Sequence, residues 1–327
     1  MHRIGVFDSG IGGLTVLRQL RRAFPQLDMV YLGDTARVPY GGRSVETITH
    51  YAEDDVHFLL RKDVEAIVIA CGTAAYAGMV AKYAIEHWVR IPVEVELAHE
   101  FRYRDPILTP RTLVVAISQS GETMDTLMAL RHAREQGSKV LAICNTQGAS
   151  IPRESDAVLY THAGPEVAVA STKAFVAQIT AAYVLGLYLA QVKGAMYRDE
   201  IAQTLDSLKD MPRKIQWVLD TQTKTVQEAA KQMVDAKSFL FLGRHVGYPV
   251  AMEGALKLKE IAYVHSEAYP AGELKHGPIS LIEEGTPVIA AATYMPLFDK
   301  AMSNVVEVQA RGAQVLALTT EAGAAQM

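Results

Sequence analysis

The strongest candidate for chemistry is a turn rich in hydroxyl groups. It follows the apolar stretch Thr112–Ile117, carries Ser118, Ser120 and Thr123, and leads into an amphipathic stretch. A strand that passes through such a turn into a helix presents free backbone N–H groups and the positive end of the helix dipole. The hydroxyls add neutral donors, which suits a phosphate ester. The spacing fits a helix cap by Ser120 equally well, so the residues alone leave both interpretations open.

Candidate acid–base groups lie in the last third of the chain. Lys257 and Glu260 are three residues apart, which places them on one face of a helix. His276 lies in a loop between a lysine and a glycine. Beside a phosphate site, a carboxylate and a histidine are what an aldose–ketose isomerase needs to move protons between carbons and oxygens. Without further information, a surface ion pair and a solvated histidine explain the pattern better.

A third candidate lies near the N-terminus, where Asp8 ends an apolar stretch and a glycine-rich turn follows. The turn lacks the third glycine of the dinucleotide-binding fingerprint. Asp8 is either a catalytic carboxylate at a strand end or the cap of the next helix, and the residues favour the cap.

Composition excludes several classes of function. The 327 residues carry a net charge of -4, which gives no reason to expect nucleic acid or an anionic membrane as a partner. The two cysteines, Cys71 and Cys144, have no C-x-x-C spacing, so we expect no disulfide framework, metal or cofactor, and a reducing cytoplasm as the location. The most apolar segment, Phe175–Val192, is interrupted by polar residues and is too short to span a bilayer, which predicts a buried helix.

The elements that must position these groups follow from the alternation of apolar and amphipathic segments. Strands are expected at 3–8, 28–33, 66–70, 92–97, 112–117, 139–144 and 157–161, with helices between them. This pattern predicts an α/β fold with parallel sheets covered by helices on both faces. Between 195 and 235, apolar residues recur at helical spacing, which predicts a helical connection.

An internal repeat organises the rest of the chain. Leu113–Ala116 recurs as Val288–Ala291, and Gly137–Ile143 recurs as Gly312–Leu318, both at an offset of 175 residues. The second copy has Ala292–Pro296 in place of the hydroxyl turn, so only the first should bind phosphate. At the same offset, counterparts of the 157–161 strand and the 171–192 helix would fall beyond residue 327, so we expect the second copy to be incomplete.

The N-terminal segments Ile4–Leu17, Gly33–Ser44 and Ile67–Cys71 closely resemble the start of glutamate racemase. The resemblance implies amino-acid-binding or proton-transfer positions at Asp8, Ser9, Pro39, Tyr40, Gly41, Cys71 and Thr73. It ends at Gly72, where that family has asparagine, and the family's second catalytic cysteine has no counterpart. Because a two-base racemization cannot run in both directions with one base missing, we expect a racemase-like remnant without its chemistry.

From residue 70 onward, the chain closely resembles the isomerase part of glucosamine-6-phosphate synthase, which is a pair of SIS (sugar isomerase) domains. The matching motifs are Glu100–Arg104, Ser118–Thr123, Ala163–Glu166, Val169–Phe175, Glu253–Glu260 and Gly272–Pro278. The resemblance implies sugar-phosphate contacts from Thr73, Ser118, Gln119, Ser120, Thr123, Val169 and Ser171. It also implies Glu260 as the base for the C1/C2 proton, Lys257 as its assistant, and His276 for ring opening in the site of a partner subunit.

These observations predict four regions: a racemase-like βαβα segment at 1–70, a first doubly wound SIS unit at 71–194, a helical connection at 195–236, and a truncated second SIS unit at 237–327. Three features depart from the synthase pattern. No glutamine-hydrolysing domain precedes the SIS units, no C-terminal tail with the family's Schiff-base lysine follows, and Ala74 replaces a serine found in many relatives. We therefore expect impaired isomerase chemistry and no use of glutamine.

The expected partner is a hexose 6-phosphate, either fructose 6-phosphate or glucosamine 6-phosphate. We expect a homodimer, because a histidine donated between subunits requires one. Two alternatives stay open: glutamate racemase, disfavoured by the missing cysteine, and a non-catalytic sugar-phosphate-binding module or gene chimera.

Overall fold

A computed structural model describes residues 3–8, 28–33 and 65–325. The chain divides into two compact units, Met1–Asp63 and Val64–Met327, and each is described by itself. In the first unit, β1 (Arg3–Asp8) pairs in parallel with β2 (Asp28–Gly33). This confirms both expected strands. The helices expected in this unit, together with Ser9, Pro39, Tyr40 and Gly41, lie outside the described residues.

The second unit begins with a five-stranded parallel sheet in the order β4-β3-β5-β6-β7. Its strands lie where the alternation of apolar segments predicts them, and in chain order they are β3 (Glu65–Ala70), β4 (Val93–Leu97), β5 (Thr112–Ser118), β6 (Lys139–Cys144) and β7 (Ala157–Tyr160).

Strand β3 lies between β4 and β5, where Ile67 is opposite Glu94 on one side and Val114 on the other. Its last five residues are buried, as expected for an inner strand of a parallel sheet. A boundary after residue 70 would leave β3 with the N-terminal segment, whereas its backbone pairing places it in the sheet of the first SIS unit. The division between the compact units falls before it, at Asp63.

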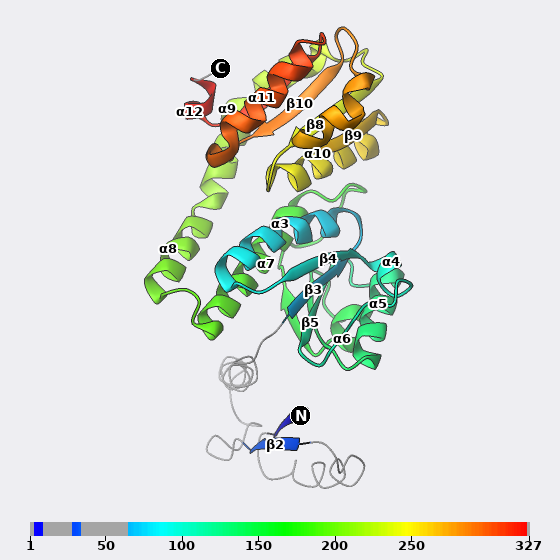
Figure 1. Ribbon diagram of the computed structural model, residues 1–327, viewed down its shortest axis with the longest axis vertical. Coiled ribbons are helices and arrows are strands. Elements are labelled where there is room, and N and C mark those ends of the chain that lie inside the picture. Colours follow the sequence, from blue (N-terminus) through cyan, green and yellow to red (C-terminus); the bar gives the residue numbers. More distant parts are fainter. Residues whose placement is uncertain (1–2, 9–27, 34–64, 326–327) are drawn as a thin grey trace. The chain divides into compact units, whose positions relative to one another are not determined.

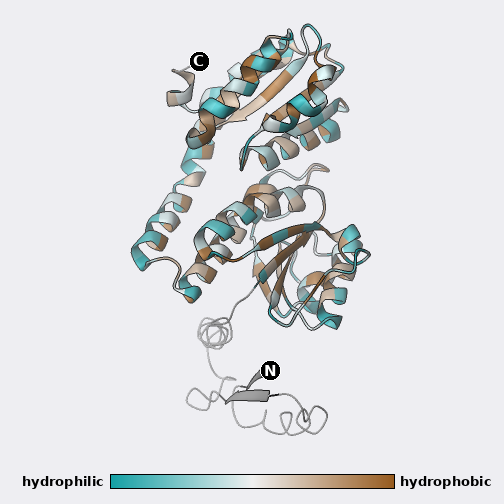
Figure 2. Ribbon diagram, viewed as in Figure 1, coloured by the Kyte–Doolittle hydropathy of each residue, from teal (hydrophilic) through white to brown (hydrophobic). Residues whose placement is uncertain are grey.

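Helices cover both faces of this sheet (Figure 1), and its strands are largely hydrophobic (Figure 2). One face is covered by α3 (Gly72–Val89) and α7 (Lys173–Lys193). The other is covered by α4 (Ala98–Phe101), α5 (Met124–Glu135) and α6 (Ser150–Glu154). On that second face, strand residues and helix residues form one buried cluster that includes Ile69, Phe101, Val114, Leu130 and Ile151.

Helix α7 is long and apolar enough to cross a membrane by length and composition alone. The expected helix is confirmed. The expectation that it is too short to span a bilayer is wrong, because it has 21 residues. Its packing gives a better reason to treat it as a core helix. Trp88 on α3 meets Tyr183 edge-to-face at 5.2 Å, and Gly186 lies against Ile85 and Trp88.

The connection between the two SIS units is helical, as the periodicity predicts. It consists of α8 (Arg198–Lys209) and α9 (Met211–Gln232). No residue of α9 is buried, and its apolar residues, such as Trp217 and Leu219, are half exposed.

The second SIS unit contains a four-stranded parallel sheet in the order β11-β10-β8-β9. The strands are β8 (Ser238–Gly243), β9 (His265–Pro270), β10 (Pro287–Ala292) and β11 (Gln314–Thr319). One face packs on α10 (Gly247–Ala262), and the other on α11 (Phe298–Gln309) and the short helix η2 (Ala271–His276). Short helices η3 (Pro278–Leu281), η4 (Met295–Leu297) and α12 (Glu321–Ala324) complete the unit.

The two sheets confirm the internal repeat. If β9, β8, β10 and β11 take the places of β4, β3, β5 and β6, the strand orders agree. The first sheet has β7 in addition, so the second has one strand fewer among the described residues. In place of the hydroxyl turn after β5, the second copy has η4, which contains Pro296. The α/β class with two SIS-type units of parallel strands is therefore confirmed.

Candidate functional site

A cavity of about 190 Å³ lies where β3 and β5 end and α3 and α5 begin. Polar side chains dominate its lining, which consists of Cys71, Thr73, Ala74, Ile117, Ser118, Gln119, Ser120, Thr123, Thr126, Ser171 and Gln178. Six of the seven residues expected to contact a sugar phosphate are among them. The edge formed by the carboxyl ends of the strands is where open α/β sheets bind their ligands.

The hydroxyl turn is held by its own hydrogen bonds. The Gly121 N–H donates to Ser118 Oγ at 3.1 Å, Ser118 Oγ lies 3.2 Å from Thr123 Oγ1, and the Glu122 N–H donates to Ser120 Oγ at 3.2 Å. Helix α5 starts after Thr123, whose side chain makes no capping hydrogen bond. Ser120 therefore shapes the turn without capping α5, so the cap interpretation is wrong for Ser120.

Contacts with α6 fix the far side of the turn. The Ile151 N–H donates to the Gly121 carbonyl at 2.9 Å, and the Ser150 N–H donates to Glu122 Oε1 at 2.7 Å. Hydrogen bonding to Ser150, first to its side chain and then to its backbone N–H, lowers the pKa of the Glu122 carboxyl. Gly121 has φ +68°, and a Cβ placed there would lie 2.6 Å from Ala149 Cβ and 2.8 Å from Cys144 Sγ. Only glycine fits both the left-handed conformation and the available space.

Three polar atoms in the cavity lining lack a hydrogen-bond partner: Thr126 Oγ1, Ser171 Oγ and Gln178 Oε1. Thr126 is 1% exposed and Gln178 is 2% exposed. Buried polar groups usually have partners, so these atoms are available to a ligand. Thr126 and Gln178 were not predicted as site residues from the sequence. Gln178 did leave a signal, as a polar residue inside the most apolar stretch of the chain.

The second copy reaches this cavity through α10. Thr73 Oγ1 donates to Glu253 Oε1 at 3.1 Å, and Lys257 Nζ donates to Thr73 Oγ1 at 3.3 Å. Lys257 lies 3.5 Å from Glu253 and forms a close ion pair with Glu260. The expected pair Lys257 and Glu260 therefore lies beside the cavity, on the same side as Thr73.

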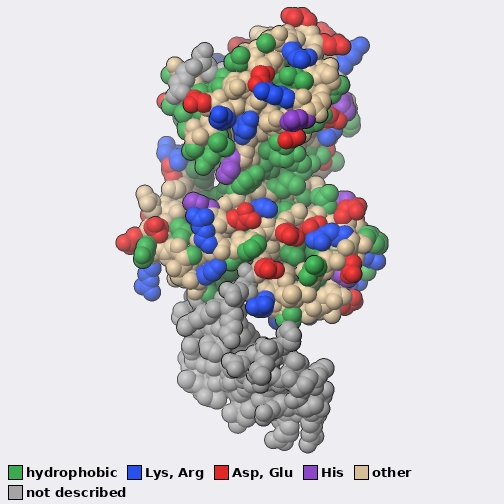
Figure 3. All heavy atoms as spheres, viewed as in Figure 1, with side chains coloured by type: hydrophobic (Ala, Val, Ile, Leu, Met, Phe, Trp, Pro, Cys, Tyr) green, Lys and Arg blue, Asp and Glu red, His purple; other side chains and the backbone are tan. Residues whose placement is uncertain are grey.

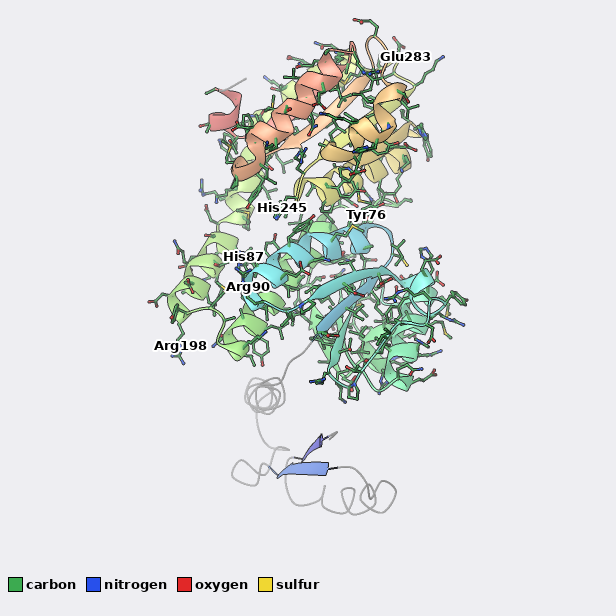
Figure 4. All side chains as sticks on the ribbon, viewed as in Figure 1. Tyr76, His87, Arg90, Arg198, His245 and Glu283 are labelled. Carbon is green, nitrogen blue, oxygen red and sulfur yellow. The ribbon has the colours of Figure 1, made fainter. Side chains whose placement is uncertain are left out.

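Glu253, which the sequence analysis did not assign to the site, is nearly buried, at 6% exposure. Burial raises the pKa of its carboxyl, and this effect outweighs the opposing effects of Lys257 and Thr73. The pKa of Tyr76 on α3 (Figure 4) is raised chiefly by burial of its side chain and next by the negative charge of Glu253. The second oxygen of Glu253, Oε2, is buried without a hydrogen-bond partner.

A stack of rings gives a second contact between the copies. The His245 ring lies 4.1 Å from that of Tyr83 on α3 and 4.7 Å from that of Tyr294 (Figure 4). Burial, together with the nearby His87, lowers the pKa of His245. The neutral ring is therefore favoured between the two tyrosines.

Two residues implied by the resemblance lie elsewhere. Val169 is fully exposed, and His276 is exposed at the end of η2. Neither belongs to the cavity lining in the described part of the chain. The neighbouring Lys275 pairs with Glu307 on α11 at 2.8 Å, which ties η2 to its own unit. Of the racemase-like positions, Cys71 lines the cavity, and Asp8 is described only as the last residue of β1.

Acidic and basic side chains are interspersed on the face of the molecule shown in Figure 3. On this face, the described residues therefore form no patch of one sign that would attract a polyanion.

Two parallel α/β units of the same strand order, with a hydroxyl-lined cavity at the strand ends of one, define a duplicated α/β protein. The family model described as "SIS domain" matches residues 59–188 and 232–325. The chain therefore belongs to the SIS domain family.

Among its relatives, the chain is similar to aminotransferases of several bacteria. The chain is 64% identical over 267 residues to glutamine–fructose-6-phosphate aminotransferase (isomerizing) of Corynebacterium efficiens, and 59% identical over 269 residues to that of Mycobacterium tuberculosis. These matches cover 80% of this chain, and 43% and 42% of the respective relatives. The chain therefore spans less than half the length of these curated relatives.

Among solved structures, the C-terminal domain of glucosamine-fructose-6-phosphate aminotransferase from Francisella tularensis has a TM-score of 0.81 at 41% identity. The match covers 84% of this chain and 77% of that structure. Glucosamine-6-phosphate deaminase from Thermotoga maritima, with a TM-score of 0.64 at 21% identity, shows the same fold.

Replacement of Gly121 by alanine should destabilise the protein and distort the hydroxyl turn. The left-handed backbone costs about 1–2 kcal/mol, and the close contacts with Ala149 and Cys144 cost about a further 1–3 kcal/mol. Urea unfolding measures the loss. Gly148→Ala is the matched control, since Gly148 also has a positive φ but nothing within 4 Å of the added Cβ. Equal losses in both variants would contradict the crowding at Gly121.

Glu253 should make stability depend on pH. Because its pKa is raised above the usual 4.5, the folded protein holds this proton to a higher pH than the unfolded chain does. The free energy of unfolding should therefore fall as pH rises from about 4.5 through the folded-state pKa.

Glu253→Gln removes this loss, so its stability relative to the wild type should increase over that range. Urea unfolding at several values between about pH 4 and 8 tests the sign. The control is Glu228→Gln on the exposed face of α9, which should show no such trend. A difference between Glu253→Gln and the wild type that is constant with pH would refute the assignment.

Proposed function

We propose that this chain binds a hexose 6-phosphate, either fructose 6-phosphate or glucosamine 6-phosphate, in the cavity at the ends of β3 and β5. The observation that carries the proposal is the convergence at Thr73. Hydroxyls of the first SIS unit line the cavity, and Lys257 of the second unit donates to the Thr73 hydroxyl at 3.3 Å. The relatives whose names include fructose 6-phosphate support this choice of substrate.

The phosphate group fits the hydroxyl turn. Ser118, Ser120 and Thr123 offer O–H groups, and the first turn of α5 offers free backbone N–H groups with the positive end of the helix dipole. The unpartnered atoms of Thr126, Ser171 and Gln178 provide further polar contacts for the sugar hydroxyls. Ala74 contributes no polar contact to this lining.

The acid–base groups fit ketose–aldose isomerization. Glu260 would accept the proton from one of C1 and C2 and return it to the other, which requires a carboxylate within reach of both carbons. The Lys257 ammonium beside it would stabilise the negative charge that develops on the substrate oxygen. His276 is exposed and does not line the cavity of its own chain. Its role in ring opening therefore requires a homodimer in which it enters the cavity of the partner subunit. We place this homodimer in the cytoplasm.

Binding without chemistry is the second candidate. The exposure of His276 and Val169 in a single chain favours it, because ring opening would then lack its acid–base group. Glutamate racemase activity is the third candidate function, and it predicts that the protein binds glutamate and not a sugar phosphate.

Glucosamine 6-phosphate should raise the melting temperature of the protein, because a ligand that binds only the folded state stabilises it. D-glutamate should not. Differential scanning fluorimetry measures both shifts. Ser118→Ala should reduce the shift with glucosamine 6-phosphate, whereas Ser207→Ala, an exposed position on α8, should not. Stabilisation by D-glutamate alone would reject the proposal.

Glu260→Gln should lower the rate of interconversion of fructose 6-phosphate and glucose 6-phosphate by roughly 100- to 10,000-fold, as for loss of a general base. A coupled dehydrogenase assay follows the reaction. Glu135→Gln on the exposed face of α5 is the control. Equal rates in wild type and Glu260→Gln would remove Glu260 from the mechanism. No turnover in wild type, with ligand binding retained, would select the non-catalytic candidate.

A further inference from the structure

Three side chains of metal-binding types meet at the rim of the cavity. Cys71 directly follows β3, His99 lies in α4 just after β4, and Asp125 lies in the first turn of α5 after β5. Because β4, β3 and β5 are neighbours in one parallel sheet, their carboxyl ends bring these residues together. One ligand atom from each lies within 4.8 Å of the others, and Cys71 Sγ is 3.8 Å from His99 Nδ1.

The donor set indicates a zinc-type ion. Thiolate sulfur, imidazole nitrogen and carboxylate oxygen are the ligands of zinc, with bond lengths of about 2.0–2.3 Å. In a tetrahedral site, these lengths place ligand atoms roughly 3.5 Å apart. The measured sulfur–nitrogen distance of 3.8 Å is close to this value. His99 and Asp125 are exposed, so their side chains have room to rotate toward an ion.

A carboxylate lies near the other nitrogen of His99, at a distance longer than a hydrogen bond. His99 Nε2 lies 3.8 Å from Glu100 Oε1. A carboxylate on the nitrogen that does not bind the metal is the usual outer arrangement, because it orients the ring and makes it a better ligand. This observation is independent of the three-residue cluster and points to Nδ1, which faces Cys71, as the ligand atom.

We propose that Cys71, His99 and Asp125 bind one zinc-type divalent ion at the rim of the cavity. Three protein ligands leave a fourth position open, as in zinc sites that accept water or a substrate atom. Cys71 also lines the cavity, so the ion would be a neighbour of any molecule bound there. The proposed metal site requires no sugar phosphate, so its test is independent of the proposed function.

Cobalt(II) is the probe, because it replaces zinc and its spectrum reports the ligands. Added to the reduced full-length chain, it should give one equivalent of tetrahedral d–d bands and a thiolate-to-cobalt band in the near ultraviolet, both lost when zinc is added. Cys71→Ser should abolish the thiolate band. Cys144→Ser should keep it, because Cys144 is the only other cysteine in the sequence. Absence of the thiolate band in wild type, or its persistence in Cys71→Ser, would overturn the proposal.

Substitution of the other ligands tests the geometry by competition for zinc with a coloured chelator. His99→Ala and Asp125→Asn should each weaken zinc binding, and Glu100→Gln should weaken it by roughly 10–100-fold. His265→Ala is the matched control, because His265 is also exposed and lies 3.6 Å from a glutamate, Glu267. If His99→Ala binds zinc as tightly as His265→Ala, the site is not the one proposed. Melting curves of each variant verify that it is folded.

Discussion

One hydroxyl group links the two halves of the site. Thr73 Oγ1 donates to Glu253 and accepts from Lys257, both on α10 of the second SIS unit. Its position is fixed by β3, because the chain leaves this inner strand at Ala70 and enters α3 at Gly72. The parallel order β4-β3-β5 then brings the loops after all three strands to the same edge. The cavity, the contact with the second copy and the proposed metal site all depend on this arrangement.

The sequence contained most of the fold because its strands are apolar and its repeat is explicit. The offset of 175 residues correctly paired β5 with β10 and β6 with β11. Strand β9 was missed because its sequence, HSEAYP, has neither an apolar run nor alternation, and it becomes a strand through pairing with β8. Strand β8 was not named although its last five residues form a buried apolar run. The placement of β3 needed its neighbours, which a local pattern does not reveal.

Some residues of the candidate site were also predicted from the sequence, and others were not. Ser118, Ser120 and Thr123 were found because they lie within six residues of one another, on a single turn. Thr126, Gln178 and Glu253 were missed because each comes from a different helix and only burial shows its importance. The proposed metal ligands span positions 71 to 125, so no spacing motif joins them. His276 and Val169 came from resemblance, and their exposure leaves their roles as predictions.

The ring stack at His245 and the hydrogen bonds of Thr73 have a consequence for cooperativity. Both join α3 of one copy to the other copy: the hydrogen bonds lie at the start of α3, beside the cavity, and the ring stack lies at Tyr83, further along the same helix. A molecule bound in the cavity would contact Thr73 of the first copy, which is hydrogen-bonded to α10 of the second. Ligand binding in the cavity would then be coupled to the position of α10 relative to α3. Destabilising the packing of the second copy would weaken ligand binding by the first.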